Sequence, residues 1–291
     1  MHFNPRHLVR LLQALPLTLP LALTSTAAAV ALPNPATTTT TTTPPPPDAR
    51  YPTRSIAGVS LIDTPLVRAA HDLAYQQYGA QPFIYGHVMR SWLFGALLLS
   101  HNGSLASRVD REVHAVAVLL HDLGWVRGSP FVSPDKRFEV DGAEAAREFV
   151  RNFTAASASA EGVAVDYADW SSDESRKLQL VWDAIALHTQ KSIAAYKEPV
   201  VAATCNGIMM EFFGPSYGVE QAEYDAVLAA FPADDFLPRT NETFIWLAET
   251  KPETTYDTFM QPFGDYFVEG YSAVGKRPFD IIAGIHSELN E

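Results

Sequence analysis

The chain of 291 residues contains 47% hydrophobic and 11% aromatic residues, which excludes wholesale disorder and suits one domain of upper-middle size or two small ones. Its 33 acidic and 21 basic residues give a net charge of -12, which repels polyanions and argues against a nucleic-acid partner. The single cysteine, Cys205, excludes an intrachain disulfide and any cysteine-rich zinc or iron–sulfur site.

Residues 1–31 have the three-part pattern of a secretory signal peptide. Arg6 and Arg10 form a basic head, residues 11–23 are apolar, and small residues follow at positions 27–31. A membrane anchor is the alternative, but two prolines interrupt an apolar run that is already short for a span. The pattern therefore predicts a cleaved signal, a secreted protein and no membrane attachment after cleavage.

Residues 32–54 are predicted to form an extended linker. Seven consecutive threonines (37–43) are followed by four prolines (44–47), and no packed core can form from this composition. A secretory route also fits three potential N-glycosylation triplets further along the chain. These Asn-x-Ser/Thr triplets begin at Asn102, Asn152 and Asn241.

Residues 55–291 show the periodicity of helices. Apolar residues recur with a helical repeat in residues 66–74, 113–120 and 178–185, whereas convincing two-residue alternation is scarce. Gly124 follows the second of these segments, where a glycine in the left-handed conformation often ends a helix. The sequence therefore predicts an all-α domain, a helical bundle of nine or ten helices.

Histidines and carboxylates on apolar helical segments are the candidates for chemistry. His121 and Asp122 follow the aliphatic run at residues 116–120, where the end of a helix favours a cation. His87 and His188 also lie among apolar residues. Each histidine alone is more simply explained as a core residue, but a buried aspartate needs a partner. A divalent metal satisfies imidazole and carboxylate together.

The ordered motifs of the chain resemble those of a known enzyme family. A histidine, a His-Asp pair and a later carboxylate on separate helices are similar to the signature of HD-domain metal-dependent hydrolases. Residues 63–282 resemble fungal HD-domain proteins of the cyanamide hydratase kind, which implies an HD fold with a C-terminal helical extension. The matching motifs are Tyr85-Gly-His87-x-x-Arg90, Leu119-Leu-His-Asp-Leu-Gly124, Arg137-Phe-Glu-Val-Asp-Gly142, Ala184-Ile-Ala-Leu-His-Thr189, Gly207-Ile-Met-Met-Glu-Phe-Phe-Gly-Pro215 and Lys251-Pro-Glu-Thr-Thr-Tyr-Asp257.

The resemblance implies one divalent metal ion, zinc in the first place, with iron or manganese as alternatives that suit the same ligands. His87, His121 and Asp122 match ligand positions of the family. Glu211 stands where the family has a fourth ligand, an aspartate, and its extra methylene would shift the metal by about an ångström or place a water between them. Phe138 stands where bimetallic members carry a further histidine, so a single metal is expected.

Catalytic roles are expected for Asp122, which would orient the attacking water, and for Glu139 or His188, which would transfer a proton. Two alternatives remain open. Glu139 would instead form an ion pair with Arg137 or Arg90, and His188 would be a core histidine bonded to a backbone carbonyl.

Arg90 and Trp125 are candidates for the substrate pocket. Arg90 lies one turn after His87 and would bind an anionic group or clamp a buried carboxylate. Trp125 would line the pocket mouth or fill the core. His114 lies two turns before His121 and is expected to pack in the core.

The leading hypothesis is a secreted metalloenzyme in which metal-activated water attacks a small uncharged substrate, as in the hydration of a nitrile to an amide or of cyanamide to urea. One alternative is a metal-dependent phosphohydrolase acting on a nucleotide or phosphate ester, which would need clustered basic residues. The other is a non-catalytic binding protein in which Glu211 marks a decayed metal site. The sequence leaves the substrate and the oligomeric state open.

Overall fold

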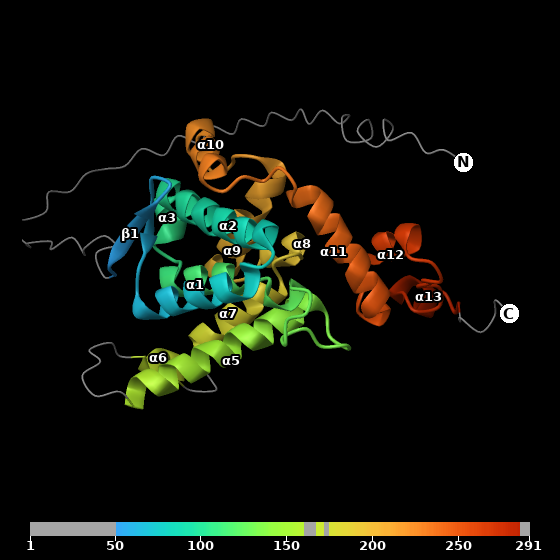
Figure 1. The fold of residues 1–291 in the computed structure, drawn as a ribbon. Helices are drawn as coiled ribbons and strands as arrows, with labels where there is room; N and C mark the ends of the chain where they lie inside the picture. Colours follow the sequence, from blue (N-terminus) through green and yellow to red (C-terminus); the bar gives the residue numbers. More distant parts are fainter. Residues whose placement is uncertain (1–50, 160–166, 172–174, 286–291) are drawn as a thin grey trace, which may run out of the picture. The chain divides into compact units, whose positions relative to one another are not determined.

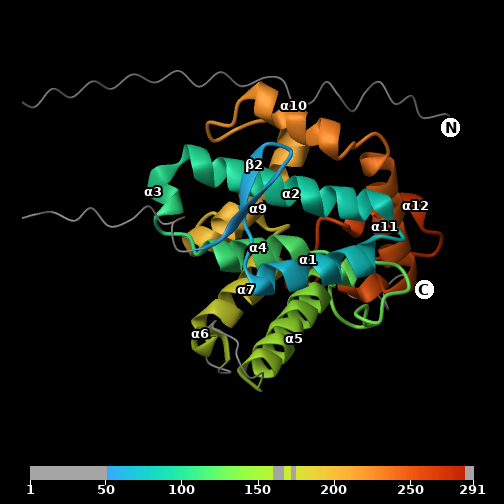
Figure 2. The ribbon, with the colours of Figure 1, turned by 60° about the vertical axis from the view of Figure 1, so that its left-hand side comes forward.

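The structure is a computed structural model that describes residues 51–159, 167–171 and 175–285. The predicted signal peptide (1–31) and residues 32–50 of the predicted linker lie outside the described residues. The described residues are mostly helical (Figures 1 and 2), which confirms the all-α prediction. Within this part of the chain, no helix combines the length and the apolar character needed to cross a bilayer.

Thirteen α-helices, two 3₁₀ turns and one two-stranded sheet make up the described residues. In chain order they are β1 (Thr53–Ile56), β2 (Val59–Ile62), α1 (Pro65–Tyr78), α2 (Pro82–His101), α3 (Gly103–Ala106), α4 (Arg111–Leu120), η3 (Leu123–Trp125), α5 (Phe138–Ser159), α6 (Ala168–Ser171), α7 (Arg176–Ala186), α8 (Lys191–Ala194), α9 (Pro199–Phe213), α10 (Gln221–Ala230), α11 (Phe236–Thr250), η4 (Pro252–Thr254), α12 (Gln261–Phe267) and α13 (Pro278–Ile282). Helices α3, α6 and α8 have four residues each, too few to show a hydrophobic repeat, and they account for the excess over the predicted nine or ten helices.

An antiparallel hairpin of β1 and β2 precedes the helices and was not predicted. The strands close at the pair Ile56–Val59 around Ala57 and Gly58, whose φ angles of 50° and 79° are both positive. Such a two-residue turn normally carries asparagine, aspartate or glycine at its first position, so alanine gave no signal. The inward-facing Leu61 is buried, and β2 packs against α2 and α4.

Helix α4 is the central helix of the bundle. Every residue from Glu112 to Leu120 is buried, and the helix contacts α1, α2, α5, α7 and α9. The side chain of Asp110 caps its N-terminus by accepting hydrogen bonds from the backbone N–H groups of Glu112 and Val113. Because a helix buried on all sides belongs to the core, the residues at its C-terminal end lie inside the protein.

Helices α2 and α9 form the most extensive helix–helix contact in the described part of the chain. They cross at two glycines, and a Cβ added at Gly207 would lie 2.8 Å from Cα of Gly95. The two backbones therefore touch, which is possible only without side chains at the crossing. This close approach lets Glu211 of α9 reach His87 and Arg90 of α2.

Helices α11, α12 and α13 lie together on one side of the bundle (Figure 1). Just after α11, the buried ammonium group of Lys251 lies 2.7 Å from the carboxylate of Asp141 in the first turn of α5. The same ammonium donates a hydrogen bond to the carbonyl oxygen of Ser133. These contacts join the C-terminal helices to the part of the chain that follows η3.

Candidate metal centre

Three side chains converge at the centre of the bundle, and we call them the cation triad: His87, His121 and Asp122. Nε2 of His87 lies 3.1 Å from Nε2 of His121 and 3.6 Å from Oδ2 of Asp122. Nε2 of His121 lies 3.2 Å from the same oxygen. All three residues are buried, and together they could bind a metal ion.

The turn that carries His121 and Asp122 is fixed by close packing against α5. Gly124 was predicted to end α4 in the left-handed conformation, but α4 ends at Leu120 and Gly124 is absent from the glycines with positive φ. A Cβ on Gly124 would lie 2.2 Å from the carbonyl oxygen of Phe138. The position therefore needs glycine for close approach to α5, and that approach holds Asp122 beside His121.

Hydrogen bonds on the far side of each ring set the tautomers of the two histidines. Nδ1–H of His121 donates to the carbonyl oxygen of Val118 at 2.7 Å, because a carbonyl can only accept. Nδ1–H of His87 donates to Oε2 of Glu211 at 2.6 Å. In the neutral rings the proton is thus on Nδ1, and the two facing Nε2 atoms both carry lone pairs.

The charges at the triad favour a positive ion between these atoms. Burial alone would raise the pKa of Asp122, but the neighbouring His121 outweighs this effect and the pKa is lowered to about 2. The pKa of His121 is raised, because the charge of Asp122 and the hydrogen bonds of the protonated ring to Asp122 and Val118 together outweigh burial, which alone would lower it. Oδ2 of Asp122 is buried and has no hydrogen-bond partner in the described part of the chain. Two nitrogen lone pairs and an ionised oxygen within 4 Å suit a divalent cation.

Glu211 lies on the opposite side of the His87 ring from the other two members of the triad, which differs from its predicted place as a fourth ligand. Its Oε2 accepts the Nδ1–H of His87, and its Oε1 accepts Nε–H of Arg90 at 2.7 Å. Arg90 is completely buried and also donates to the carbonyl oxygens of Phe231 and Pro232. Arg90 therefore clamps a buried carboxylate, one of its two predicted roles, and Glu211 orients His87.

His188 lies beside the triad. Its Nε2 is 3.8 Å from Oδ1 of Asp122, and its Nδ1–H donates to the carbonyl oxygen of Ile185. Burial, followed by the charge of His121, lowers the pKa of His188 to about 4. His188 is thus bonded to a backbone carbonyl, as one reading of the sequence had it, and still presents a neutral Nε2 toward Asp122.

Glu139 is separated from the triad by a neighbouring threonine. Its carboxylate lies 3.0 Å from Nη2 of Arg137 and accepts a hydrogen bond of 2.7 Å from Oγ1 of Thr189. The ion pair with Arg137 is the alternative that the sequence left open for Glu139. Thr189, and not Glu139, lines the cavity described next.

A cavity of about 410 Å³ opens directly onto the triad, and we call it the apolar cavity. Its lining is largely aromatic and aliphatic, and contains no lysine or arginine. Trp125 lies in this lining, as predicted, whereas Arg90 does not. The lining residues are His87, Asp122, Trp125, Phe138, His188, Thr189, Ile208, Met209, Phe212, Phe213, Phe236, Thr240, Phe244 and Phe259.

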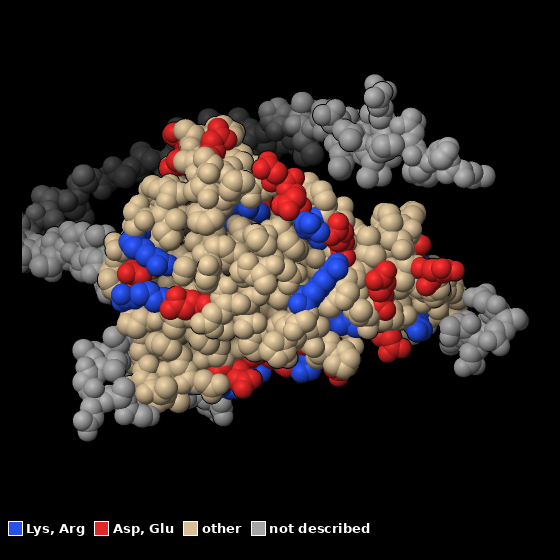
Figure 3. Space-filling view, viewed as in Figure 1, with Lys and Arg blue, Asp and Glu red and all other residues tan. Residues whose placement is uncertain are grey.

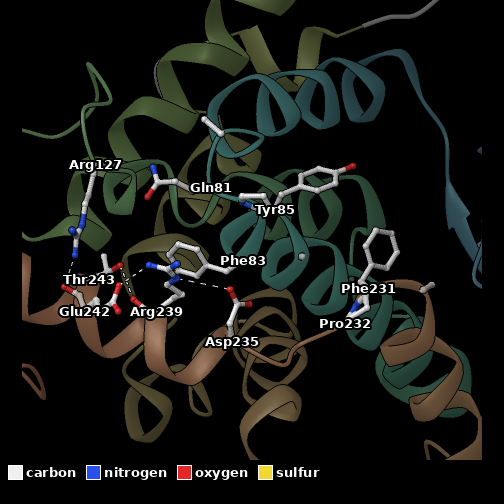
Figure 4. Close-up of a pocket in the computed structure, with 14 residues that line it drawn as sticks. Gln81, Phe83, Tyr85, Arg127, Phe231, Pro232, Asp235, Arg239, Glu242 and Thr243 are labelled. Atoms are coloured by element: carbon white, nitrogen blue, oxygen red, sulfur yellow. Dashed lines mark hydrogen bonds and ion pairs between the residues drawn. The ribbon is translucent and has the colours of Figure 1, made fainter.

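A second, larger cavity of about 490 Å³ lies at the start of α2 and does not include any member of the triad (Figure 4). Two arginines enter it, but neither guanidinium is free. Arg127 donates to the carbonyl oxygen of Glu242, and Arg239 pairs with the carboxylates of Asp235 and Glu242. Because opposite charges cancel there and no candidate catalytic group faces it, the apolar cavity is the better candidate for the active site.

The aromatic residues of α11 and the segment after it are the part of the site that the sequence analysis missed. Phe236 stacks on the His87 ring, with ring centroids 4.7 Å apart and an interplanar angle of 16°. Phe244 and Phe259 pack against one another in the cavity wall. Nothing in their spacing distinguishes them from ordinary core residues, so only the fold reveals that they surround the triad.

Charged residues give no clear guide to a partner. On the face drawn in Figure 3, lysine and arginine residues are scattered among acidic residues and form no continuous basic patch. Comparison of the sequence with protein-family models and with curated proteins gives no match. The function therefore has to be inferred from the chemistry of the triad and its cavity.

Proposed function

We propose that this protein is a metal-dependent enzyme of the hydrolase or hydro-lyase class, in which water attacks a small uncharged substrate at the cation triad. The observation that carries the proposal is the 3.1 Å separation of two imidazole Nε2 atoms whose Nδ1–H groups are both used elsewhere. A bound divalent ion would supply Lewis acidity, which lowers the pKa of water toward 7. Zinc is the first candidate, and iron or manganese suit the same ligands.

Residues around the triad are arranged to handle the protons of such a reaction. The ionised carboxylate of Asp122 holds and orients the attacking water by accepting its hydrogen bond. Nε2 of His188 is unprotonated and accepts a proton from that water, while its own Nδ1–H stays on the Ile185 carbonyl. Glu139 does not take part directly, because it reaches the cavity only through Thr189.

Hydration of a nitrile to an amide is the reaction that we propose. The oxygen of water bonds to the nitrile carbon, and one π bond of the C≡N group breaks. Its electron pair takes up, on nitrogen, the proton that His188 received from the water. The resulting imidic acid tautomerises to the amide, so the whole step adds one water and needs no other reactant. An uncharged substrate fits a cavity lined without lysine or arginine.

Phosphate-ester hydrolysis is less well supported by the same cavity. Phosphoryl transfer is catalysed largely by cations placed around the phosphate oxygens. Arg90, the nearest guanidinium in the motifs, is already paired with Glu211 and bonded to two backbone carbonyls. A panel of nucleotides and phosphate esters should therefore show no turnover above background.

Metal analysis and a nitrile assay test the proposal together. The purified protein should hold about one equivalent of a divalent metal. It should also convert simple nitriles to amides, which chromatography detects, and it should release no ammonia. His121→Ala should lose both metal and activity while circular dichroism stays unchanged. His101→Ala is the matched control, because His101 is an exposed histidine paired with Glu223.

Either of two results would contradict the proposed function. Less than about a tenth of an equivalent of metal after gentle purification would instead indicate a binding protein with a decayed site. Full metal content in the His121→Ala variant would show that the triad is not the ligand set.

A further inference from the structure

We infer that the substrate is an uncharged molecule with one small polar head and an apolar body, several times larger than cyanamide. The inference rests on the proposed function for its reaction, but its recognition chemistry is read from the apolar cavity alone. The polar head would lie at Asp122 and His188, and the body would extend between α9 and the C-terminal aromatic residues.

The size of the apolar cavity is the first observation. Its volume is about 410 Å³, within the range in which drug-sized ligands are bound. A molecule such as cyanamide is hardly larger than two or three waters, each of which takes about 30 Å³ in the liquid. It would leave most of an apolar space unfilled by substrate, and apolar walls gain little from contact with water.

The distribution of polar groups in the cavity is the second observation. The Nε1–H of Trp125 and Oγ1 of Thr240 are both buried and have no hydrogen-bond partner among the described residues. Buried polar groups normally have partners, so these two groups are suited to hydrogen bonds with a polar group of the substrate. The other polar side chains of the lining belong to His87, Asp122, His188 and Thr189, and its remaining eight residues are apolar.

The mouth of the cavity is the third observation. Phe212, Phe213 and Phe259 line it and still expose 43%, 72% and 42% of their surface. Aromatic side chains left in water beside a cavity lower the free energy of an apolar ligand that covers them. A substrate body that reaches this rim would bury surface that the free protein leaves exposed.

A series of straight-chain amides, from acetamide to hexanamide, tests the apolar body through binding alone. Amides are the products of nitrile hydration and carry a small, uncharged polar head on the same apolar body. With metal-loaded protein, calorimetry should show a dissociation constant that falls about fourfold for each added methylene, which amounts to about two hundredfold over the series. Affinities that stay within threefold across the series would overturn the inference.

Filling the cavity should weaken this dependence on chain length. Met209 lines the cavity, and Met209→Trp should weaken hexanamide at least tenfold while acetamide binding changes less than twofold. Tyr196→Trp is the matched control, because Tyr196 is 91% exposed and lies outside the lining. If Met209→Trp does not fold, Phe212→Ser at the exposed rim should still weaken hexanamide several-fold. Unchanged hexanamide binding in a folded variant would contradict the inference.

Turnover of matching nitriles separates this inference from the proposed function. Faster hydration of hexanenitrile than of acetonitrile, judged by kcat/KM, supports both. If amide affinity rises with chain length but no nitrile is hydrated, the proposed reaction is wrong and the recognition of an apolar body stands. If cyanamide is hydrated but amide affinity does not change with chain length, the proposed reaction stands and the recognition of an apolar body is wrong.

Discussion

The imidazole of His87 is held from two sides. Glu211 accepts its Nδ1–H, and Phe236 stacks on its face. Arg90 in turn holds Glu211 and lies 5.3 Å from the Phe236 ring. This chain of contacts fixes both the tautomer and the orientation of a candidate metal ligand, and residues that do so usually matter almost as much as the ligands themselves.

Replacing Glu211 by glutamine tests this role. Glu211→Gln keeps the size of the side chain but removes the negative charge that accepts the Nδ1–H of His87, so metal affinity should fall about 10- to 100-fold. Competition with a chelator of known affinity measures the change. Glu223→Gln, at the exposed partner of His101, should leave affinity unchanged. Equal affinities for the two variants would contradict the role given to Glu211.

His114 makes the stability of the fold depend on pH. Burial, followed by the nearby charge of Arg111, lowers the pKa of His114 to about 4, and its Nε2 has no partner in the described part of the chain. In the unfolded chain the pKa is about 6.5, so the unfolded state binds the proton first as the pH falls. The stabilisation is therefore complete above pH ~6.5 and is lost progressively between pH ~6.5 and ~4.

Urea unfolding of the wild type and His114→Gln measures this loss. Between pH 7.5 and pH 5 the wild type should lose about 2 kcal/mol more unfolding free energy than the variant, because the variant has no proton to bind there. Glutamine keeps a polar side chain against Gly95, which the imidazole now contacts closely. Parallel losses in both proteins would show that another group is responsible.

At the scale of elements, the crossing of α2 and α9 decides the geometry of the site. Gly207→Ala would place a methyl group 2.8 Å from backbone Cα of Gly95, and backbone cannot move aside as a side chain can. The unfolding free energy should fall by about 1–3 kcal/mol, as in other overpacked cores. Gly103→Ala is the control, because no atom lies within 4 Å of its added Cβ, and thermal unfolding of both variants measures the difference.

The Gly207→Ala variant should also lose metal affinity, because a wider crossing moves Glu211 away from His87. Unchanged thermal stability together with unchanged metal affinity would mean that the helices adjust without cost.

The elements that the sequence predicted are those with a strong local signal. The apolar repeat of residues 113–120 predicted α4, and its end predicted where His121 and Asp122 would lie. The hairpin at Ala57 and the four-residue helices have no such signal, because their residues carry neither turn chemistry nor enough length for a repeat. Glu211 was expected as a fourth ligand, and its position at Nδ1 of His87 was not foreseen, because the sequence gives distance along a helix but not the angle at which two helices cross.

At the scale of the whole molecule, one buried ion pair joins the beginning of α5 to the end of α11. Lys251→Met would leave the Asp141 carboxylate buried without its cation, so the unfolding free energy should fall by about 3–5 kcal/mol. Because the triad lies on other elements, about one equivalent of metal should remain at temperatures where the variant is folded. Chemical denaturation and metal analysis check both statements.

Adding Asp141→Asn to Lys251→Met should restore part of the lost stability, because the second change removes the unpaired charge. A double variant as unstable as the single one would show that packing, and not charge, accounts for the loss.

The apolar cavity is a property of the whole chain that the sequence did not predict. Its polar end follows from motifs around His121, but its walls come from Phe236, Phe244 and Phe259, more than a hundred residues away. Aromatic residues at these positions could equally have filled a core. Only the way in which α11 turns back over α2 distinguishes the two outcomes.

The reactive groups come from α2 and the turn after α4, and much of the surrounding wall comes from the last third of the polypeptide, attached through Lys251. Wall residues that do not contact the His87 ring, such as Phe244 and Phe259, could therefore be exchanged without disturbing the reactive groups. Under the proposed function, a lineage in which these phenylalanines were replaced would accept different substrates. The residues that activate water would stay the same. Relatives that share the reactive groups would then differ in their substrates more than in the reaction they catalyse.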